Sequence, residues 1–441
     1  MLVMNSDRLA KLLLWITGLV LAFGRWATQI WIGPFPIMDL FIQSLILTAI
    51  SIYGFRLGIY FSESTLKFLN FSLLLIYGYS VLKIASGVMT GNYPINLIIR
   101  DEMSFFVIGE IIFFCCIFQN IFSDKDMEMR LEKMFIFVGM VSFLQCAASL
   151  LFTDLHGWEV QFSPMEFQAN LFSVRSDQFA TAVSPLIATS IYNITSRKRL
   201  FINLALLFMT LLLIFAELPS RAVLISTLLT LVLSWSISNS WKKKTPAMNA
   251  LKISITVLIS PFIFLMLSTL ISFQRLLSGL GLKLDSSDTS PILNGAIGTQ
   301  SARQQAWTLI LNDWSNSYLL NGYPAGYHFI KESGALFFLS GSEDVRWPHN
   351  FFISCLVRNG IFFGVILIVC CITLVYVSFL NTKLNSRSLL DLQIMVLQVS
   401  TILVSCFGVV LESPFGYLPF AVASSISIVR YRLSRRNHFY A

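Results

Sequence analysis

The chain carries little charge for its length. Asp, Glu, Lys and Arg together make up 12% of the 441 residues, whereas 56% of the residues are hydrophobic. Soluble domains carry about twice that share of charge, so the composition excludes a water-soluble protein of this size. The apolar residues form repeated runs of roughly 20 residues, the length that crosses a bilayer as an α-helix. Because such runs are too long for barrel strands, we predict an all-α polytopic membrane protein.

Cysteine is missing from the longest polar loop. The seven cysteines, all inside apolar runs, are at positions 115, 116, 146, 355, 370, 371 and 406. We therefore expect no disulfide in that loop, and the spacing fits no zinc site. A P-loop, a zinc-binding helix motif and a nucleophile elbow are also missing. We expect neither a metal nor an organic cofactor.

Twelve apolar runs predict about twelve transmembrane helices, with both chain ends on one side. Their expected ranges are 9–24, 38–55, 66–88, 103–122, 134–152, 177–195, 200–217, 221–238, 252–272, 350–379, 393–411 and 415–430. No small-residue cleavage site follows the first run, so we interpret it as a retained helix rather than a signal peptide.

Lys and Arg indicate the orientation of these helices. They are about twice as frequent in the connections on one side as on the other, and the richer side is expected in the cytoplasm. Both termini then lie inside. The net charge of +8 is explained by this asymmetry and by attraction to anionic membrane lipid, not by nucleic-acid binding.

The sequence divides into three parts around one large outer loop. Residues 1–272 hold the first nine expected spans, 273–349 form the loop, and 350–441 hold the last three spans and a cytoplasmic tail. Within the loop, Trp307, Ile310, Leu311 and Trp314 have helical spacing, which predicts a helix over 301–314 with one apolar face on the membrane or the transmembrane bundle.

Three shorter segments outside the lipid have recognisable patterns. Residues 321–326 predict a turn, because they hold two glycines and a proline. Residues 333–342 hold a short apolar piece between glycines. The aromatic residues of 153–176 suggest a helix lying at the membrane interface.

Two arginines are expected at helix starts on the outer side. Ser301 and Gln304 form a capping-box pattern, which places Arg303 in the first turn of the loop helix. Arg221 follows Ser220 in the same way at the start of the span 221–238. Helix starts attract anions, and a guanidinium adds a forked grip on phosphate oxygens. The alternative is that both arginines extend to lipid headgroups.

His349 follows Pro348 at the expected start of the span 350–379. Proline is favoured in a first helical turn, so His349 is also expected at a helix start, beside Arg346. Nearby cations would lower the pKa of the imidazole and keep it neutral, as a general base requires. The alternative is a capping or interfacial histidine.

Two more arginines complete the set of candidates. Arg175 precedes the span 177–195 on the outer side. Arg358 lies within the span 350–379, about 12 Å below the membrane surface. It should face protein or water, with Glu110 or Glu412 as its expected ion-pair partner.

Several motifs together resemble the shared region of bacterial O-antigen polymerases and O-antigen ligases. These are Ser-x-Arg-x-x-x-Trp at 301–307, Asn-Gly-Tyr-Pro-Ala-Gly-Tyr at 321–327, His-Asn at 349–350, Asn-Gly-Ile-Phe-Phe-Gly at 359–364 and Pro-Ser-Arg-Ala at 219–222. The resemblance extends over about residues 170–430. The chain departs from it at Arg358, where family members often have an acidic residue.

The resemblance implies a function, a location and a set of roles. It implies a GT-C-like, inverting, metal-independent glycosyltransferase of the bacterial inner membrane. This enzyme would act at the periplasmic face on a glycan linked to undecaprenyl diphosphate. Arg221 and Arg303 would bind the donor diphosphate, with Arg346 and Arg175 as further binding candidates. His349 would act as base or orienter for the acceptor hydroxyl.

Three functions remain open at this point. Polymerase is preferred, with a chain-length regulator as a further partner, and ligase to lipid A–core is the alternative. A transporter is the rival from another class. It should show broken helices in matching halves, with charges near the membrane midplane.

Overall fold

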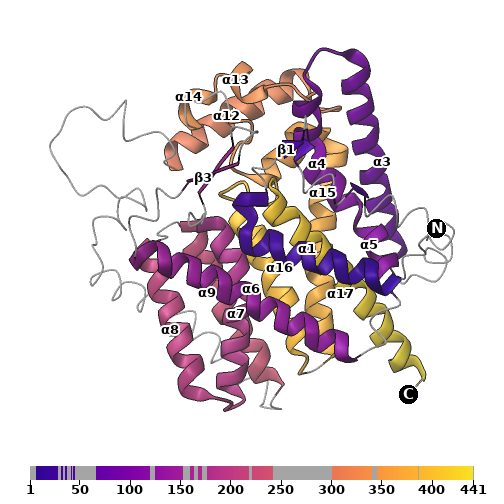
Figure 1. The fold of residues 1–441 in the computed structure, drawn as a ribbon. Coiled ribbons are helices and arrows are strands. Elements are labelled where there is room, and N and C mark those ends of the chain that lie inside the picture. The colour runs from indigo at the N-terminus through magenta and orange to yellow at the C-terminus, as the bar shows by residue number, and fades with distance from the viewer. Residues whose placement is uncertain are drawn as a thin grey trace.

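The protein is predominantly helical, with two small strand pairs (Figure 1). The computed structural model describes residues 6–27, 31–32, 35–36, 41, 43–44, 66–119, 125–151, 159–162, 167–170, 176–217, 221–241, 300–339, 345–385 and 387–440. The longer described helices form one bundle. They are α1 (Ser6–Ala27), α3 (Lys67–Thr90), α4 (Ile95–Gly109), α5 (Ile111–Phe118), α6 (Lys125–Leu151), α7 (Ser176–Thr195), α8 (Leu200–Glu217), α9 (Arg221–Ser240), α15 (Phe351–Leu384), α16 (Leu389–Ser405) and α17 (Pro414–Tyr440).

Helices occur where most of the apolar runs predicted them. The expected spans 38–55 and 252–272 lie almost wholly outside the described residues, and the other expected ranges each overlap a described helix. Within the described part, α3, α6, α9 and α15 contain stretches long and apolar enough to cross a membrane. Shorter apolar stretches lie in α1, α8 and α16. The number of twelve crossings stays a prediction.

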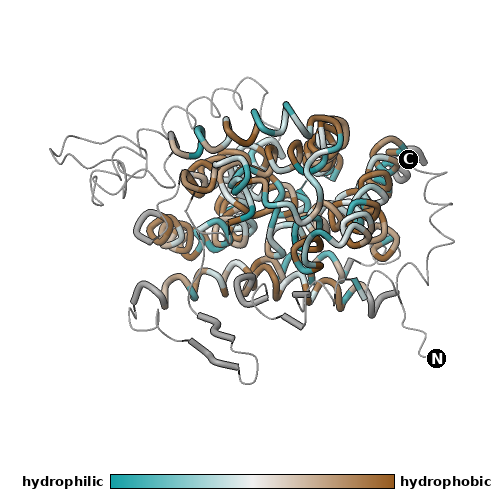
Figure 2. The backbone as a smooth tube through the Cα atoms, turned by 90° about the horizontal axis from the view of Figure 1, so that it is seen from above, coloured by the Kyte–Doolittle hydropathy of each residue, from teal (hydrophilic) through white to brown (hydrophobic). Residues whose placement is uncertain are grey.

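The bundle has large apolar side chains on its surface and polar ones inside. Phe201 is 84% exposed and Phe68 is 75% exposed, whereas Gln393, Gln398 and Ser400 are buried. In Figure 2, most helical turns are hydrophobic and hydrophilic turns gather toward the middle of the bundle. This arrangement suits lipid surroundings, where buried polar residues join helices by hydrogen bonds.

Interhelical hydrogen bonds connect these buried polar side chains. Gln398 accepts a bond from Ser378 of α15 at 2.5 Å and donates one to Ser424 of α17 at 2.7 Å. Gln393 donates to Thr189 of α7 at 2.9 Å. Helix α16 therefore lies between three neighbours in the polar interior of the bundle.

The expected span 103–122 is wrong in its start and its continuity. Helix α4 begins eight residues earlier, directly after Pro94, and is separated from α5 by Glu110. Proline is favoured at a helix start, which explains why the helix begins there rather than at the apolar run. The shift brings Asp101 and Glu102 into the middle of α4.

The segment 153–176 contains a strand pair where an interfacial helix was expected. Strands β3 (Glu159–Phe162) and β4 (Phe167–Asn170) pair antiparallel, with Phe162 opposite Phe167. The sequence between them contains Pro164, and the β-branched and aromatic residues alternate, which favours a hairpin over a helix. Strands β1 (Trp31–Ile32) and β2 (Phe35–Pro36) form a second, shorter pair.

The described part of the outer loop forms a compact helical unit at one end of the bundle. It consists of α12 (Gln300–Ser317), α13 (Phe329–Glu332) and α14 (Leu336–Leu339), shown at the top of Figure 1. Ala306, Ile310 and Trp314 of α12 are buried against Tyr323 and other residues of the same unit and against α15. The apolar face of the predicted helix is thus covered largely by the loop itself rather than by membrane.

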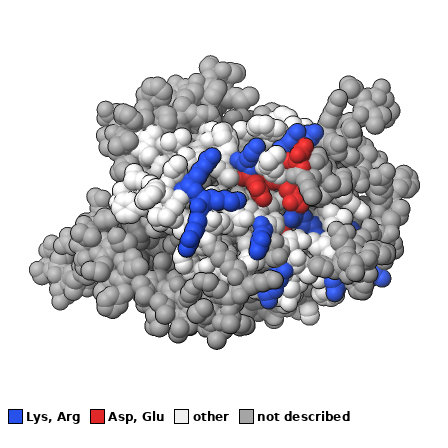
Figure 3. All heavy atoms as spheres, turned by 90° about the horizontal axis from the view of Figure 1, so that it is seen from below, with Lys and Arg blue, Asp and Glu red and all other residues white. Residues whose placement is uncertain are grey.

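The opposite end of the bundle carries the connections rich in Lys and Arg. Arg430 of α17 bonds to Asp391 at the start of α16 at 2.6 Å and to Glu128 at the start of α6. Figure 3 shows this end from below, where Lys and Arg predominate over Asp and Glu. The asymmetry matches the one from which orientation was predicted, and the side on which each end lies remains a prediction.

Candidate functional site

Arg303 lies in the first turn of α12, as the sequence predicts. The helix begins at Gln300, so Ser301 is inside the first turn rather than its cap. Nη1 of Arg303 donates to the carbonyl oxygen of Phe407 at 2.7 Å. Phe407 belongs to the connection 406–413 between α16 and α17, and this bond joins the loop unit to that connection.

Trp307, one turn further along α12, lies against the segment that precedes α15. Its Nε1 donates to the carbonyl oxygen of Pro348 at 2.7 Å. His349 follows directly. The first turn of α12 and the segment carrying His349 are therefore neighbours, although more than 40 residues separate them in sequence.

His349 lies just before α15 rather than inside its first turn. The helix begins at Phe351, and its cap is Asn350, whose side chain accepts from the backbone N–H of Phe352 at 3.0 Å and of Ile353 at 3.2 Å. His349 has a φ of 55°, in the left-handed region that residues other than glycine rarely adopt. The expected helical conformation at Pro348 and His349 is therefore wrong, because the Asn350 side chain is the stronger cap. The proposed loss of charge on the imidazole stays a prediction.

The connection 406–413 also contacts α7 and α15. A Cβ placed on Gly408 would lie 3.4 Å from Oδ2 of Asp177, in the first turn of α7. Ser354, in the first turn of α15, donates from its hydroxyl to Oε1 of Glu412. The connection is itself held by the backbone N–H of Leu411, which donates to the Ser405 hydroxyl at 3.1 Å.

Helix α9 begins at Arg221, as predicted, and lies at the same end of the bundle. Ser226 of α9 bonds to Ser400 of α16 at 2.7 Å, and Ser400 donates to the carbonyl oxygen of Ala180 in α7 at 3.2 Å. The starts of α7 and α9 therefore lie beside the end of α16. The Arg221 side chain and the whole of Arg175 lie outside the described residues.

Four helix starts thus meet around one short connection. We call this region the helix-start cluster: the first turns of α7, α9, α12 and α15, with the connection 406–413. Helix starts present unpaired N–H groups and a partial positive charge, which together favour binding of phosphate. The sequence places Arg175, Arg221, Arg303 and His349 at or beside these four starts.

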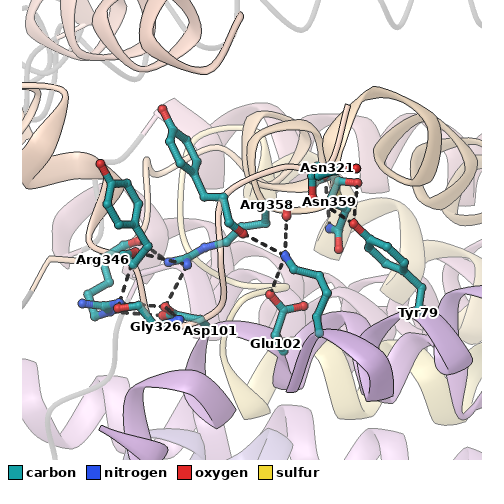
Figure 4. A network of polar contacts seen from close by, with 12 residues as sticks. Tyr79, Asp101, Glu102, Asn321, Gly326, Arg346, Arg358 and Asn359 are labelled. Carbon is teal, nitrogen blue, oxygen red and sulfur yellow. Dashed lines mark hydrogen bonds and ion pairs between the residues drawn. The ribbon is translucent and has the colours of Figure 1, made fainter. Parts of the chain in front are cut away.

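Arg346 belongs to a second polar region, buried beneath the loop unit (Figure 4). The residue is 4% exposed, and its guanidinium makes two bonds to Asp101 of α4, at 3.1 Å from Nε and 2.7 Å from Nη2. Nη2 also donates to the carbonyl oxygen of Gly326 at 2.7 Å. Arg346 therefore faces protein in this structure, and its proposed contact with diphosphate stays a prediction.

Arg358 pairs with Asp101, not with the expected Glu110 or Glu412. Its side chain is fully buried, and Nη1 lies 2.8 Å from Oδ2 of Asp101. The planar group also lies over the rings of Phe329 and Trp347, at 4.6 and 5.3 Å from the ring centres. The expected type of interaction, a structural ion pair, is correct. The partner is different because α4 begins early enough to present Asp101 to α15.

Lys83 and Glu102 extend this region toward α3. Nζ of Lys83 lies 2.9 Å from Oε1 of Glu102 and donates to the carbonyl oxygens of Tyr323, at 3.0 Å, and of Arg358. We call Lys83, Asp101, Glu102, Arg346 and Arg358 the Asp101 network. Three cations and two carboxylates lie together there within a buried space, and Figure 4 shows Arg346 and Arg358 directed toward Asp101.

The arginines keep Asp101 ionised. Burial favours the neutral acid, but the charge of Arg358 and the hydrogen bonds and charge of Arg346 outweigh it. The pKa of Asp101 is therefore lowered from its ordinary value. A carboxylate held between two guanidinium groups serves as a fixed anchor for the chain on either side of it.

Sequence reasoning missed the carboxylates of both regions. Asp101 and Glu102 stand next to each other at the edge of an apolar run, in a chain with 23 acidic residues. An acidic pair in that position is typical of a solvated helix end, so the sequence offers only a weak signal. Glu412 was expected as a partner for Arg358 and was not among the predicted site residues.

Comparisons with known proteins leave the family open. No protein-family model matches the chain, and no curated protein is detectably similar to it. The functional argument therefore depends on the residues themselves and on the motifs that they form.

Proposed function

We propose that this protein is a glycosyltransferase that polymerises O-antigen repeat units linked to undecaprenyl diphosphate. The reaction takes place at the periplasmic face of the bacterial inner membrane, inverts the anomeric centre and needs no metal. The motifs shared with O-antigen polymerases and ligases support this proposal, and so does the meeting of helix starts at the end of the bundle that carries the outer loop.

One observation carries the proposal. The bonds Trp307–Pro348 and Arg303–Phe407 bring the first turn of α12, the segment of His349 and the connection 406–413 to one place. These segments hold a guanidinium and an imidazole, one suited to an anion and the other to a proton. A transferase that uses a lipid diphosphate needs both functions close to the same sugar.

The chemistry follows from the bond that breaks. The acceptor hydroxyl attacks the anomeric carbon of the donor sugar, and undecaprenyl diphosphate leaves with the bonding electrons. Arginines that offset the growing negative charge can do the work of a divalent cation. Arg303, Arg221 and Arg175 are proposed for this role, with Arg346 as a further candidate. His349 acts as base or orienter for the hydroxyl.

The bilayer supplies the substrate. The exposed apolar surface of the bundle would let the polyprenyl chain approach from the lipid while its diphosphate stays at the outer border. Anionic lipid and a chain-length regulator are the expected partners.

The test uses purified protein in proteoliposomes with lipid-linked repeat units. Wild type should produce lipid-linked glycans of increasing length, and His349→Ala should lose at least about 100-fold in rate while expressing normally. His328→Ala is the matched control, because His328 caps α13, which is not one of the four helices of the helix-start cluster. Equal activity of the His349 variant and wild type would remove His349 from the site.

The same assay separates the alternatives. Transfer that occurs only after lipid A–core is added would identify a ligase. Movement of the lipid-linked unit across the membrane without any new glycosidic bond would identify a transporter and overturn the proposal.

A further inference from the structure

Glu412 is a buried carboxyl group with half of its hydrogen-bonding capacity unused. The residue is 6% exposed. Its Oε1 accepts the Ser354 hydroxyl, whereas Oε2 is buried and has no hydrogen-bond partner among the described residues. Buried polar atoms are nearly always satisfied, so an orphaned carboxyl oxygen in a native protein requires a reason.

A structural ion pair does not supply that reason. The nearest cation in sequence on α15 is Arg358, one turn beyond Ser354. Arg358 acts on Glu412 through space, but its Nη1 bonds to Asp101 at 2.8 Å. Glu412 therefore has a hydroxyl as its only hydrogen-bond partner in the described part of the chain.

The surroundings of Glu412 bring the pKa of its carboxyl group close to neutral pH. Burial raises the pKa of Glu412 to about 8, and the Ser354 hydrogen bond and the charge of Arg358 only partly oppose this rise. A group that gains and loses its proton near neutral pH is suited to general acid–base work.

The groups around Glu412 come from several elements. The charged and titratable residues nearest to the connection 406–413 or to Glu412 include Cys355 and Arg358 on α15, Arg303 on α12, Asp177 on α7 and Tyr417 on α17, and Cys406 lies in the connection itself. Arg303 and Asp177 approach at residues 407 and 408, whereas Arg358 acts on Glu412 itself and Glu412 acts on Cys355.

The position of Glu412 places it within the helix-start cluster. It lies five residues after Phe407, which accepts the bond from Arg303, and it bonds to the first turn of α15, which begins just after His349. In the ionised form the orphaned oxygen is an acceptor, and a hydroxyl group is a donor that would satisfy it.

We propose that Glu412 is the catalytic base, whose Oε2 takes the proton of the acceptor sugar hydroxyl. This inference rests on the proposed glycosyl transfer. As the hydroxyl oxygen bonds to the anomeric carbon, its O–H bond breaks and the proton moves to Oε2. The bond from the anomeric carbon to the diphosphate breaks, and its electrons leave with undecaprenyl diphosphate. The proton passes to solvent before the next turn. His349 then orients the hydroxyl rather than keeping its proton.

Activity assays test the role directly. Glu412→Gln keeps the shape and the bond from Ser354 but cannot accept a proton, so kcat should fall by about 10²–10⁴-fold with KM within a few-fold of wild type. Glu412→Asp should recover part of the rate and shift the pH profile. Glu332→Gln, at an exposed carboxylate of α13, is the matched control. Full activity of Glu412→Gln in folded protein would overturn the proposal.

A second measurement does not depend on catalysis. Infrared difference spectra recorded from about pH 5 to about pH 10 should show a protonated carboxyl band that disappears with a midpoint near 8, and Glu412→Gln should lack this band. A spectrum unchanged by the substitution would overturn the proposal.

The two failures can be told apart. If wild type forms no glycosidic bond from any lipid-linked donor, the proposed function is wrong, and the base role is wrong with it. If wild type is active and Glu412→Gln is equally active, only the role of Glu412 is wrong.

Discussion

Asp101 and Glu412 are two buried carboxyl groups attached to the first two turns of α15. Asp101 bonds to Arg358, and Glu412 bonds to Ser354, one turn earlier on the same helix. Asp101 has two guanidinium partners, whereas Glu412 has a single hydroxyl. The pKa of Asp101 is lowered and that of Glu412 is raised, to about 8.

Equal burial therefore leads to opposite charge states, because the partners differ. A permanently ionised carboxylate can anchor arginines but cannot exchange a proton near neutral pH. A carboxyl group that bonds to no cation can exchange a proton in that range. Where their surroundings push the pKa values of two neighbouring acids apart in this way, the two acids take different tasks in the same region. We assign an anchoring task to Asp101 and a chemical one to Glu412.

The largest expected effect follows from breaking the anchor. Asp101→Leu leaves two buried guanidinium groups without their shared anion and should destabilise the protein by about 3–5 kcal/mol. The variant should express poorly, and thermal unfolding of the detergent-purified protein should show a lowered midpoint. Changing Arg346 and Arg358 to Leu and Met in the same variant should recover much of the loss, since no charge then stays unpaired. An unchanged midpoint in the single variant would show that the network does not anchor the loop.

The next effect concerns activity without stability. Arg303→Lys keeps a positive donor near the Phe407 carbonyl but loses the planar fork that is proposed to hold two phosphate oxygens. Polymerisation should slow by about 100-fold, or about 2.7 kcal/mol, with the melting temperature unchanged. Arg387→Lys, at the opposite end of the bundle, is the control. Near-normal glycan length would remove Arg303 from the site.

A smaller effect should appear in the pH dependence of stability, with opposite signs for the two acids. The folded protein holds the Glu412 proton up to about pH 8, whereas the ordinary value for a glutamate is 4.5. Glu412 therefore favours the folded state most at low pH, and this contribution falls as the pH rises between those values. Asp101 favours the folded state above its ordinary value of 3.8, and this contribution is lost as the pH falls below it.

Melting temperatures recorded across this range test the difference. Wild type should lose a few degrees between about pH 5 and about pH 9, and Glu412→Gln should lose less. Identical slopes in the two proteins would mean that Glu412 is already ionised at pH 5.

The smallest expected effect is that of a chelator. If arginines offset the diphosphate charge, EDTA should leave the polymerisation rate unchanged within about two-fold. Strong inhibition that Mg²⁺ reverses would show that a metal takes part, and Glu412 would then need to be considered as its ligand.

Helices that depend on a local pattern were predictable from the sequence. The spacing of Trp307, Ile310 and Trp314 predicts α12, and Ile310 and Trp314 are indeed buried. The length of the apolar runs likewise predicts helices such as α3 and α15. What covers the apolar face of α12 was not predictable, because the covering residues come from α13, α14 and α15.

The contacts of the site depend on distant parts of the chain. Asp101 and Arg346 are 245 positions apart, and nothing in their local surroundings relates them. The early start of α4 at Pro94 decides that Asp101 faces Arg358, and the apolar run alone pointed to a later start. Arg303 and His349, in contrast, belong to motifs whose helix-start character is local, so their candidacy needed no structure.

The break in α15 at Gly360 has a consequence for how substrate enters. Gly360 has a φ of 73°, and a Cβ there would lie 1.9 Å from the carbonyl oxygen of Leu320. The backbone N–H groups of Tyr323 and Ile361 donate across this crossing to the carbonyls of Val357 and Leu319, at 2.8 and 2.9 Å. These bonds therefore fix residues 319–323 to residues 357–361 of α15. A movement of the loop unit about this joint would have to break those bonds. Under the proposed function, a lipid-linked glycan would therefore enter between helices rather than by displacement of the loop unit.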